Sequence, residues 1–214
     1  DGSEMTPDDV PNNSLSILLT QSGETRDLIA CMDYLKNKNI YMIGCVNKVD
    51  SYISTQVNTC IFLDAGTERG VASTKSFTSQ VFVLNMIALQ ISEVNIKNIK
   101  KKRYDNINNI INVSNNLTYV LNCTKIIDFA EKIKNKNSMF LLAKGINYPI
   151  VEEGALKIKE LSYIHAEAYS GSALKHGPFS LLEQTFPVIL IINNDEHYNK
   201  MKNAFDEIKA RGAN

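Results

Sequence analysis

The stretch Ser16–Asp27, S-I-L-L-T-Q-S-G-E-T-R-D, decides how the rest of the chain is interpreted. An apolar run leads into a turn of hydroxyl-bearing residues, and apolar residues then recur at helical spacing from Leu28. This order predicts a buried strand, a turn and a helix N-terminus. Free backbone N–H groups, the positive end of a helix dipole and neighbouring hydroxyls can together bind an anion. The same pattern suits a turn in which Ser22 or Thr25 merely caps the helix, so both interpretations stay open here.

The remainder of the first half alternates apolar runs with amphipathic ones. The near-continuous apolar run Ile40–Val46, I-Y-M-I-G-C-V, suits a strand of a parallel sheet that is covered on both faces. The alternation predicts an α/β protein with a doubly wound, mostly parallel sheet, whose ligands bind at the carboxyl ends of the strands. Besides this strand we expect the strands Leu15–Leu19 and Cys60–Leu63 and the helices Glu24–Asn37, Asp50–Val57 and Val81–Ile91.

The second half of the chain repeats the strand–turn–helix plan. We therefore expect two similar subdomains, residues 15–115 and 116–214, preceded by a polar tail over residues 1–14. The expected strands are Met139–Ala143, Phe186–Ile192 and, as a short strand or turn, Ala166–Tyr169. The expected helices are Lys125–Lys136, Val151–Ile164, His176–Glu183 and Tyr198–Arg211.

The composition excludes several classes of protein. Lysine plus arginine equals aspartate plus glutamate at 23 each, so no global basic field points to nucleic acid. No apolar run approaches the roughly 20 residues that span a membrane, and the first residues do not have the pattern expected of a signal peptide. The cysteines form no C-x-x-C and are typical of reduced thiols in a cytosolic protein. The chain does not begin with methionine, and we expect it to be part of a longer protein.

The stretch Asn95–Asn116 is rich in asparagine and lysine and contains K-K-K-R at 100–103. Such a run could contact nucleic acid. In a chain without net charge, a solvated helix face or a surface insertion is the favoured interpretation, because isoleucines recur at roughly helical spacing from Ile96 to Ile111.

The expected helix Val151–Ile164 carries charged side chains at informative spacings. Glu153 and Lys157 are i, i+4 and Lys157 and Glu160 are i, i+3, so the three share a face. An exposed helix with ion pairs explains this pattern, and so does a general base poised beside a charge-compensating lysine. Gly154 is unfavourable inside a helix, which suggests a close approach by another backbone or by a ligand.

His176 lies in L-K-H-G-P-F, where Gly177 and Pro178 constrain the backbone around it. A lone histidine is more often structural than catalytic, but this one falls in a turn without an apolar stripe to explain it, and histidine is a common acid–base residue. The chain has no H-x-x-x-H, C-x-x-C or acidic cluster typical of a metal site. It also lacks a G-x-G-x-x-G, Walker or G-x-S-x-G pattern. No metal is therefore expected.

Four longer motifs occur in order and together resemble one family. They are L-T-Q-S-G-E-T at 19–25, G-V-A-S-T-K-S-F-T-S-Q at 70–80, E-G-A-L-K-I-K-E-L-S-Y-I-H-A-E-A-Y at 153–169 and L-K-H-G-P at 174–178. They are similar to the sugar isomerase (SIS) domain of the glutamine–fructose-6-phosphate aminotransferases, the glucosamine-6-phosphate synthases. The resemblance covers about residues 15–205. It implies a three-layer α/β/α sandwich of the SIS type, with two subdomains that are incomplete at the two ends of the chain.

The resemblance also implies a reaction and a set of binding residues. The family makes glucosamine 6-phosphate from fructose 6-phosphate and glutamine, at the start of UDP-N-acetylglucosamine synthesis, and no cofactor is implied. The residues that would hold the sugar phosphate are Thr20, Gln21, Ser22 and Thr25, and those that would contact the sugar are Val71 and Ser73.

Three further residues would carry out the chemistry that the resemblance implies. Glu160 would be the base that moves a proton between C1 and C2 of the fructose-6-phosphate imine, and Lys157 would stabilise the charge that develops on the enolamine. His176 would assist opening of the sugar ring and reach the active site of a neighbouring subunit, which implies a homodimer or a higher oligomer. The resemblance further implies a glutaminase domain as partner and a cytoplasmic location.

The chain departs from the family pattern in several respects. The glutaminase domain, the first strand with its C-G-T-S loop and a C-terminal segment with a further lysine are not part of it, so we expect little or no synthase activity from the chain alone. Ser172 and Ala173 stand where G-E is usual, and Lys144 stands where arginine is usual. Two alternatives are a regulatory SIS module that binds a phosphosugar without catalysis, and a related phosphosugar isomerase or deaminase. Retention of all three catalytic candidates argues against the first.

Overall fold

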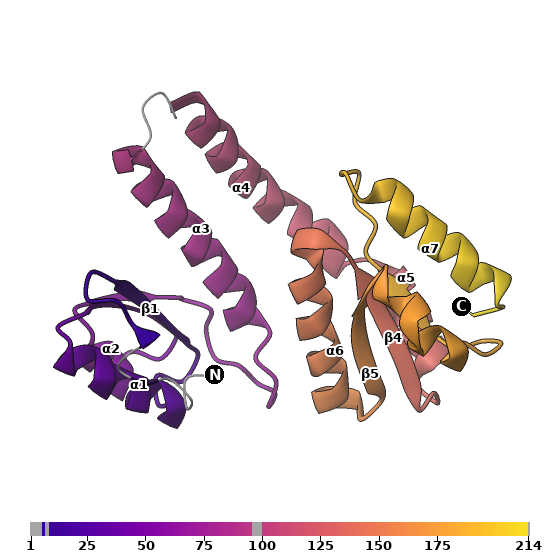
Figure 1. Cartoon of the computed structure of the whole chain (residues 1–214), viewed down its shortest axis with the longest axis horizontal. Helices are drawn as coiled ribbons and strands as arrows, with labels where there is room; N and C mark the ends of the chain where they lie inside the picture. The colour runs from indigo at the N-terminus through magenta and orange to yellow at the C-terminus, as the bar shows by residue number, and fades with distance from the viewer. Residues whose placement is uncertain (1–5, 7–8, 96–99, 214) are drawn as a thin grey trace. The chain divides into compact units, whose positions relative to one another are not determined.

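The chain divides into two compact units, Asp1–Asn112 and Val113–Asn214, and each is described by itself (Figure 1). The structure is a computed structural model that describes residue 6 and residues 9–95 and 100–213. Much of the expected polar tail over 1–14 and residues 96–99 of the asparagine- and lysine-rich stretch lie outside the described residues.

Unit 1 is built on a three-stranded parallel sheet whose strands lie in sequence order. The strands are β1 (Leu15–Thr20), β2 (Tyr41–Val46) and β3 (Thr59–Phe62). The helices are α1 (Arg26–Asn37), α2 (Tyr52–Gln56) and α3 (Lys75–Asn95). The register pairs Thr20 with Val46, and Val46 with Phe62, so the three strands end at the same edge of the sheet.

Helices cover both faces of this sheet. The helices α1 and α2 pack on one face, over a core that contains Leu18, Met32, Leu35, Val46 and Ile53. The helix α3 packs on the other face, where the buried residues are Cys45, Leu63 and Val83. The near-continuous apolar character of β2 is therefore explained, because its side chains are buried on both sides. The expected three layers are confirmed in this unit.

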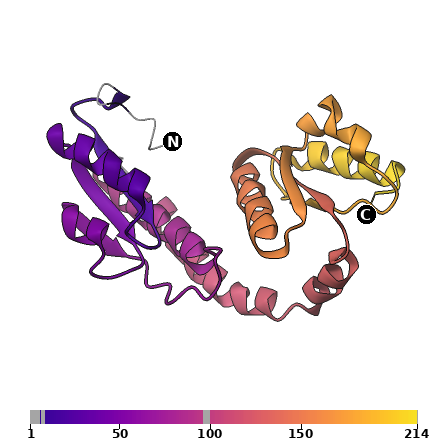
Figure 2. The ribbon, with the colours of Figure 1, turned by 90° about the horizontal axis from the view of Figure 1, so that it is seen from below.

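Unit 2 holds a second parallel sheet, in the order β5-β4-β6, with its first strand in the middle. Its helices lie on both sides of the sheet (Figure 2). The strands are β4 (Ser138–Ala143), β5 (His165–Ser170) and β6 (Val188–Leu190). The α-helices are α5 (Thr124–Ile133), α6 (Tyr148–Ser162) and α7 (Tyr198–Ala210), and the 3₁₀ helices are η3 (Gly145–Asn147), η4 (Ala173–His176) and η5 (Pro178–Leu181). Because the chain crosses from one side of β4 to the other after β5, this sheet is doubly wound as expected.

Alternate residues of β4 face opposite layers of unit 2. Met139 and Leu141 belong to the core under α5 and α6, whereas Phe140 and Leu142 belong to the core under α7, η4 and η5. Gly154 lets α6 approach the sheet, because a Cβ there would lie 3.3 Å from Cδ2 of Leu141. The expectation of a backbone or ligand beside Gly154 is therefore wrong, and a core side chain takes that place.

The helix α4 (Lys100–Leu121) contains most of the asparagine- and lysine-rich stretch and spans the boundary between the units. Residues 111–121 are all exposed, which agrees with the interpretation as a solvated helix face. Within the residues that the structure describes, no helix is long and apolar enough to cross a membrane.

Several element bounds differ from the sequence expectation; β6, for example, is shorter than the expected strand Phe186–Ile192. Two of the differences have local reasons. The helix α3 begins at Lys75, well before the expected Val81, because the loop that precedes it supplies a cap. The single helix expected over His176–Glu183 is instead the end of η4 followed by η5. Gly177 separates them with a φ of 139°, and Pro178 cannot continue the preceding helical hydrogen bonding.

Candidate functional site

A cavity of about 450 Å³ opens at the carboxyl end of the sheet in unit 1. It is lined by Gln21, Asn47, Lys48, Asp64, Gly66 and Thr67, which follow the ends of β1, β2 and β3. Asn47 joins two of these loops: its amide nitrogen donates to the carbonyl of Gly66 at 2.8 Å, and its Oδ1 accepts from the N–H of Ala65 at 2.9 Å. The cavity therefore lies where open α/β sheets bind ligands.

The turn between β1 and α1 is held by its own hydroxyls. Thr20, which is buried, accepts a hydrogen bond from the N–H of Gly23 at 3.1 Å, and its Oγ1 lies 3.0 Å from Oγ1 of Thr25. Oγ of Ser22 accepts from the N–H of Glu24 at 3.1 Å. No side chain of the described residues caps α1, so the interpretation of Ser22 or Thr25 as its cap is wrong. The first N–H groups of this helix consequently lack a side-chain acceptor.

Gly23 is the point at which this turn packs against the rest of unit 1. Its φ is +68°, and a Cβ there would lie 1.9 Å from Oγ and 2.5 Å from Cβ of Ser51. Its carbonyl accepts from the N–H of Ile53 at 2.9 Å, at the start of α2. Ser51 is 1% exposed, and its Oγ has no hydrogen-bond partner among the described residues. Glycine is therefore required by both backbone conformation and space.

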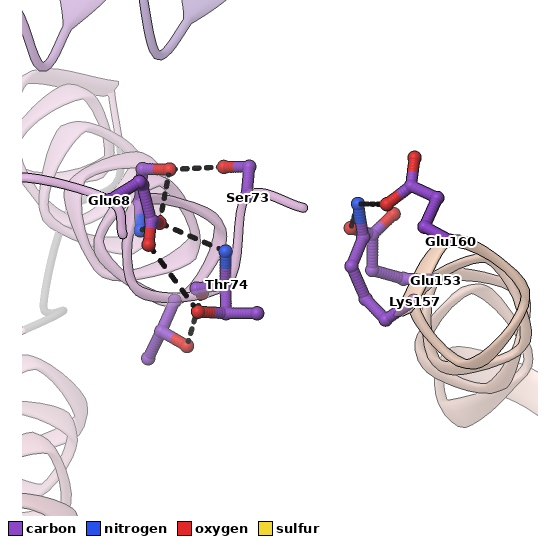
Figure 3. A network of polar contacts seen from close by, with 8 residues as sticks. Glu68, Ser73, Thr74, Glu153, Lys157 and Glu160 are labelled. Carbon is purple, nitrogen blue, oxygen red and sulfur yellow. Dashed lines mark hydrogen bonds and ion pairs between the residues drawn. The ribbon is translucent and has the colours of Figure 1, made fainter. Parts of the chain in front are cut away.

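The second hydroxyl-rich loop is organised by Glu68 (Figure 3). Oε1 of Glu68 accepts from the N–H of Thr74 at 2.9 Å, from the N–H of Ser76 at 3.0 Å and from Oγ of Ser76 at 3.0 Å. Oγ of Ser73 is hydrogen-bonded to Oγ of Ser76. Val71, at the tip of the loop, is 97% exposed. A carboxylate of the chain thus caps the N-terminus of α3, a position that favours negative charge.

We expect Glu68→Ala to lower the free energy of unfolding by about 1 kcal/mol, the usual effect of losing a helix cap. The N–H of Ser76 is the main cause that lowers the pKa of Glu68 below its ordinary 4.5; burial opposes this shift, and Thr74, Ser76 Oγ and Lys75 add to it. Because the folded-state pKa is the lower one, this stabilisation is present above pH 4.5 and is lost as the pH falls through the folded-state pKa.

The free energy of unfolding in urea, measured at several pH values from about pH 3 to about pH 7, tests this expectation. This range includes the ordinary pKa of a carboxyl group. Glu68→Gln is the matched control, because it keeps an acceptor oxygen but cannot titrate. If the free energy of unfolding depended on pH in the same way in Glu68→Ala and in the unmodified chain, the assignment of Glu68 as the cap would be contradicted.

In unit 2, α6 presents one lysine between two carboxylates (Figure 3). Nζ of Lys157 lies 2.8 Å from Oε2 of Glu160 and 3.4 Å from Oε1 of Glu153, and these side chains are only 19% to 34% exposed. Burial would lower the pKa of Lys157, but the hydrogen bond to Glu160 and the charge of Glu153 outweigh it, so this pKa is raised. The lysine is therefore held as a cation beside two carboxylates.

His176 ends η4 and is exposed. Among the described residues it makes no hydrogen bond or ion pair with Glu160 or Lys157. The structure therefore brings together the two α6 candidates, Lys157 and Glu160, and leaves His176 apart from them.

The sequence-predicted residues of unit 1 fall into two separate groups. Thr20 and Thr25 share a hydrogen bond and Gln21 lines the cavity, whereas Ser73 belongs to the network around Glu68. Sequence reasoning missed Asn47 and Lys48, which line the cavity, and Glu68. The signal for the first two was present, because they directly follow a strand that was expected to end at the ligand-binding edge. No group of three or more His, Cys, Asp or Glu residues within the described residues could hold a metal ion.

Known proteins resemble the chain over its whole length. A probable glutamine–fructose-6-phosphate aminotransferase (isomerizing) of Acanthamoeba polyphaga mimivirus is 42% identical over 225 residues, covering 100% of this chain and 35% of the relative. The Escherichia coli enzyme of that name is 38% identical over 206 residues, covering 95% of this chain and 34% of the relative. The chain thus spans about a third of the length of these curated relatives.

A solved structure agrees with these relatives. The C-terminal domain of glucosamine-fructose-6-phosphate aminotransferase from Francisella tularensis superimposes with a TM-score of 0.89 at 33% identity, covering 95% of this chain and 58% of that one. The family model for the SIS domain matches residues 2–90 and 132–214, which include both sheets and every candidate site residue. The chain belongs to the SIS domain family.

Proposed function

We propose that the chain is the isomerase part of a glutamine–fructose-6-phosphate aminotransferase, which converts fructose 6-phosphate and glutamine into glucosamine 6-phosphate and glutamate. The observation that carries the proposal is the α6 arrangement, in which Lys157 is hydrogen-bonded to Glu160 within a motif typical of these enzymes. The curated relatives at 42% and 38% identity bear this name and support it.

The turn at 20–25 is proposed to bind the phosphate of the sugar. Two helix starts of unit 1 stand next to hydroxyl-rich loops, those of α1 and α3. The N–H groups at the start of α3 are taken by Glu68, whereas no side chain caps α1. Because uncapped N–H groups at a helix N-terminus attract anions, α1 is the better phosphate site of the two. Gln21, Ser22 and Thr25 add polar groups at the same place.

Glu160 is proposed to take a proton from C1 of the fructose-6-phosphate imine and to return it to C2. Its Oε2 is held by Lys157, while its Oε1 accepts no hydrogen bond from the described residues and can receive the proton. The ammonium of Lys157 would compensate the negative charge that develops on the enolamine. His176, exposed on a short turn, is proposed to assist ring opening in a neighbouring subunit of a homodimer or higher oligomer.

We also propose that Val71 and Ser73 contact the sugar, that a glutaminase domain supplies the ammonia, and that the protein works in the cytoplasm. The nearly full exposure of Val71 leaves its backbone and side chain available to a ligand. The four cysteines lie far apart in the sequence and form no C-x-x-C, which is typical of a reducing compartment.

Exchanging both Ser22 and Thr25 for alanine is expected to weaken the binding of fructose 6-phosphate about tenfold or more, because two hydroxyl donors to the phosphate are lost. Binding of unphosphorylated fructose should not change. Isothermal titration calorimetry with both sugars measures the difference, and Thr55→Ala, an exposed hydroxyl on α2, is the control. An equal loss for both sugars would refute the phosphate assignment.

A further inference from the structure

A second cavity, of about 220 Å³, lies at the carboxyl end of the sheet in unit 2. It is bounded by the loop after β4, the loop after β5 and one face of α7. The order of the strands in the sheet is β5-β4-β6, so β5 and β6 lie on opposite sides of β4, and the chain connections from β4 go to one side first and then to the other. Such a switch point is where doubly wound sheets bind ligands. None of the candidate residues of α6 lines the cavity.

The base of this cavity is built by a close approach between Gly171 and Met201. A Cβ on Gly171 would lie 2.5 Å from Sδ of Met201, which is 2% exposed, and the N–H of Gly171 donates to the carbonyl of Ala143 at 3.0 Å. Nζ of Lys144 donates to Oγ of Ser172 at 2.9 Å and thereby joins the loops that follow β4 and β5. The walls are thus held by contacts between different elements of one unit.

The side chains that line this cavity carry a net positive charge. Three ammonium groups, those of Lys144, Lys175 and Lys200, stand against the single carboxylate of Glu207. That carboxylate is already paired with Lys175, at 2.6 Å. Among the residues that the structure describes, the only partner of Lys144 is the neutral hydroxyl of Ser172, and Lys200 makes no hydrogen bond or ion pair. Two ammonium groups therefore lack an anion.

We propose that this cavity binds a small phosphate monoester, separately from the sugar-phosphate site of unit 1. A phosphate carries close to two negative charges at neutral pH and offers three acceptor oxygens, which match the two uncompensated ammonium groups and the hydroxyl of Ser172. A carboxylate would leave one of the two ammonium groups without a charge partner. The volume of about 220 Å³ admits the phosphate with only a few further atoms, so the bound ester is compact.

The test measures the binding of inorganic phosphate to the 214-residue chain by isothermal titration calorimetry, with acetate as the carboxylate arm. The background is Ser22→Ala with Thr25→Ala, so that binding in unit 1 does not obscure the second site. Two variants are made in this background. One carries both Lys144→Ala and Lys200→Ala. The other, the matched control, carries Lys202→Ala, which changes an exposed lysine of α7 that does not line the cavity. Circular dichroism checks that each variant keeps its fold.

The paired lysine variant is expected to weaken phosphate binding about tenfold or more, whereas Lys202→Ala changes it by less than about twofold. Acetate should bind more weakly than phosphate to the background protein. Three results would overturn the proposal: no phosphate binding to the background protein, equal losses in the paired and control variants, or acetate binding as tight as that of phosphate. Every protein in this experiment carries the substitutions Ser22→Ala and Thr25→Ala, so binding in unit 1 does not contribute. Failure of this proposal would therefore not count against the proposed function.

Discussion

Gly23→Ala will lower the free energy of unfolding by roughly 2–4 kcal/mol and abolish fructose-6-phosphate binding, because the new methyl group cannot be accommodated. The backbone of Gly23 has a φ of +68°, and the added Cβ would lie 1.9 Å from Oγ of Ser51, which is itself buried. The turn would have to move away from α2, and its N–H groups would move with it. Urea unfolding and titration calorimetry measure the two effects.

Gly66→Ala separates steric overlap from backbone strain. Gly66 has nearly the same φ, +69°, but a Cβ there meets nothing within 4 Å. We expect this variant to lose only about 1 kcal/mol, the cost of the left-handed conformation alone. Adding Ser51→Gly to Gly23→Ala removes the opposing side chain and should recover part of the lost stability. Equal losses for Gly23→Ala and Gly66→Ala, or no recovery in the double variant, would show that contact with Ser51 is not the cause.

Glu160→Gln is expected to reduce isomerisation by roughly 100-fold or more, with little change in fructose-6-phosphate binding, because the amide cannot accept the C1 proton. The assay uses a chimaera in which this chain replaces the matching segment of the Escherichia coli relative, since the chain spans 34% of that protein. Formation of glucosamine 6-phosphate and exchange of the C1 proton with deuterated solvent are followed together.

Glu153→Gln is the matched control for this experiment, because Glu153 also pairs with Lys157 on the same helix. It should change turnover by no more than a few-fold, since Lys157 keeps its hydrogen bond to Glu160. Unchanged turnover in Glu160→Gln would remove Glu160 from the mechanism. A similar loss in both variants would mean that the charge around Lys157, and not a base at Glu160, is what matters.

The features that the sequence predicted well are local ones. The apolar run, the hydroxyl turn and the helix pattern over Leu15–Asn37 lie within two dozen residues, and they form β1, the turn and α1 as expected. Likewise, the i, i+3 spacing of Lys157 and Glu160 places them on one face of α6. Hydrophobic periodicity and helix geometry determine such features without knowledge of the fold.

The features that the sequence did not reveal depend on residues brought together by folding. Nothing in the pattern around Gly23 indicates that Ser51 fills the space beside it. The early start of α3 depends on Glu68, which reaches forward along the chain to the N–H groups of Thr74 and Ser76. A cap over α1 was one of the two interpretations that residue preference left open, but Thr25 instead bonds Thr20, because a partner on the preceding strand was within reach.

The carboxylate of Glu68 has a consequence for the kinetics of the proposed reaction. A fructose 6-phosphate molecule has one charged end and one polyol end, so a second open anion site in unit 1 would allow it to bind in reverse. Because Glu68 occupies the N–H groups at the start of α3, a phosphate could not bind there, and this non-productive orientation would be excluded. Loss of Glu68 should therefore lower kcat and KM for the sugar phosphate by the same factor and leave kcat/KM unchanged, a signature of non-productive binding that loss of helix stability alone would not give.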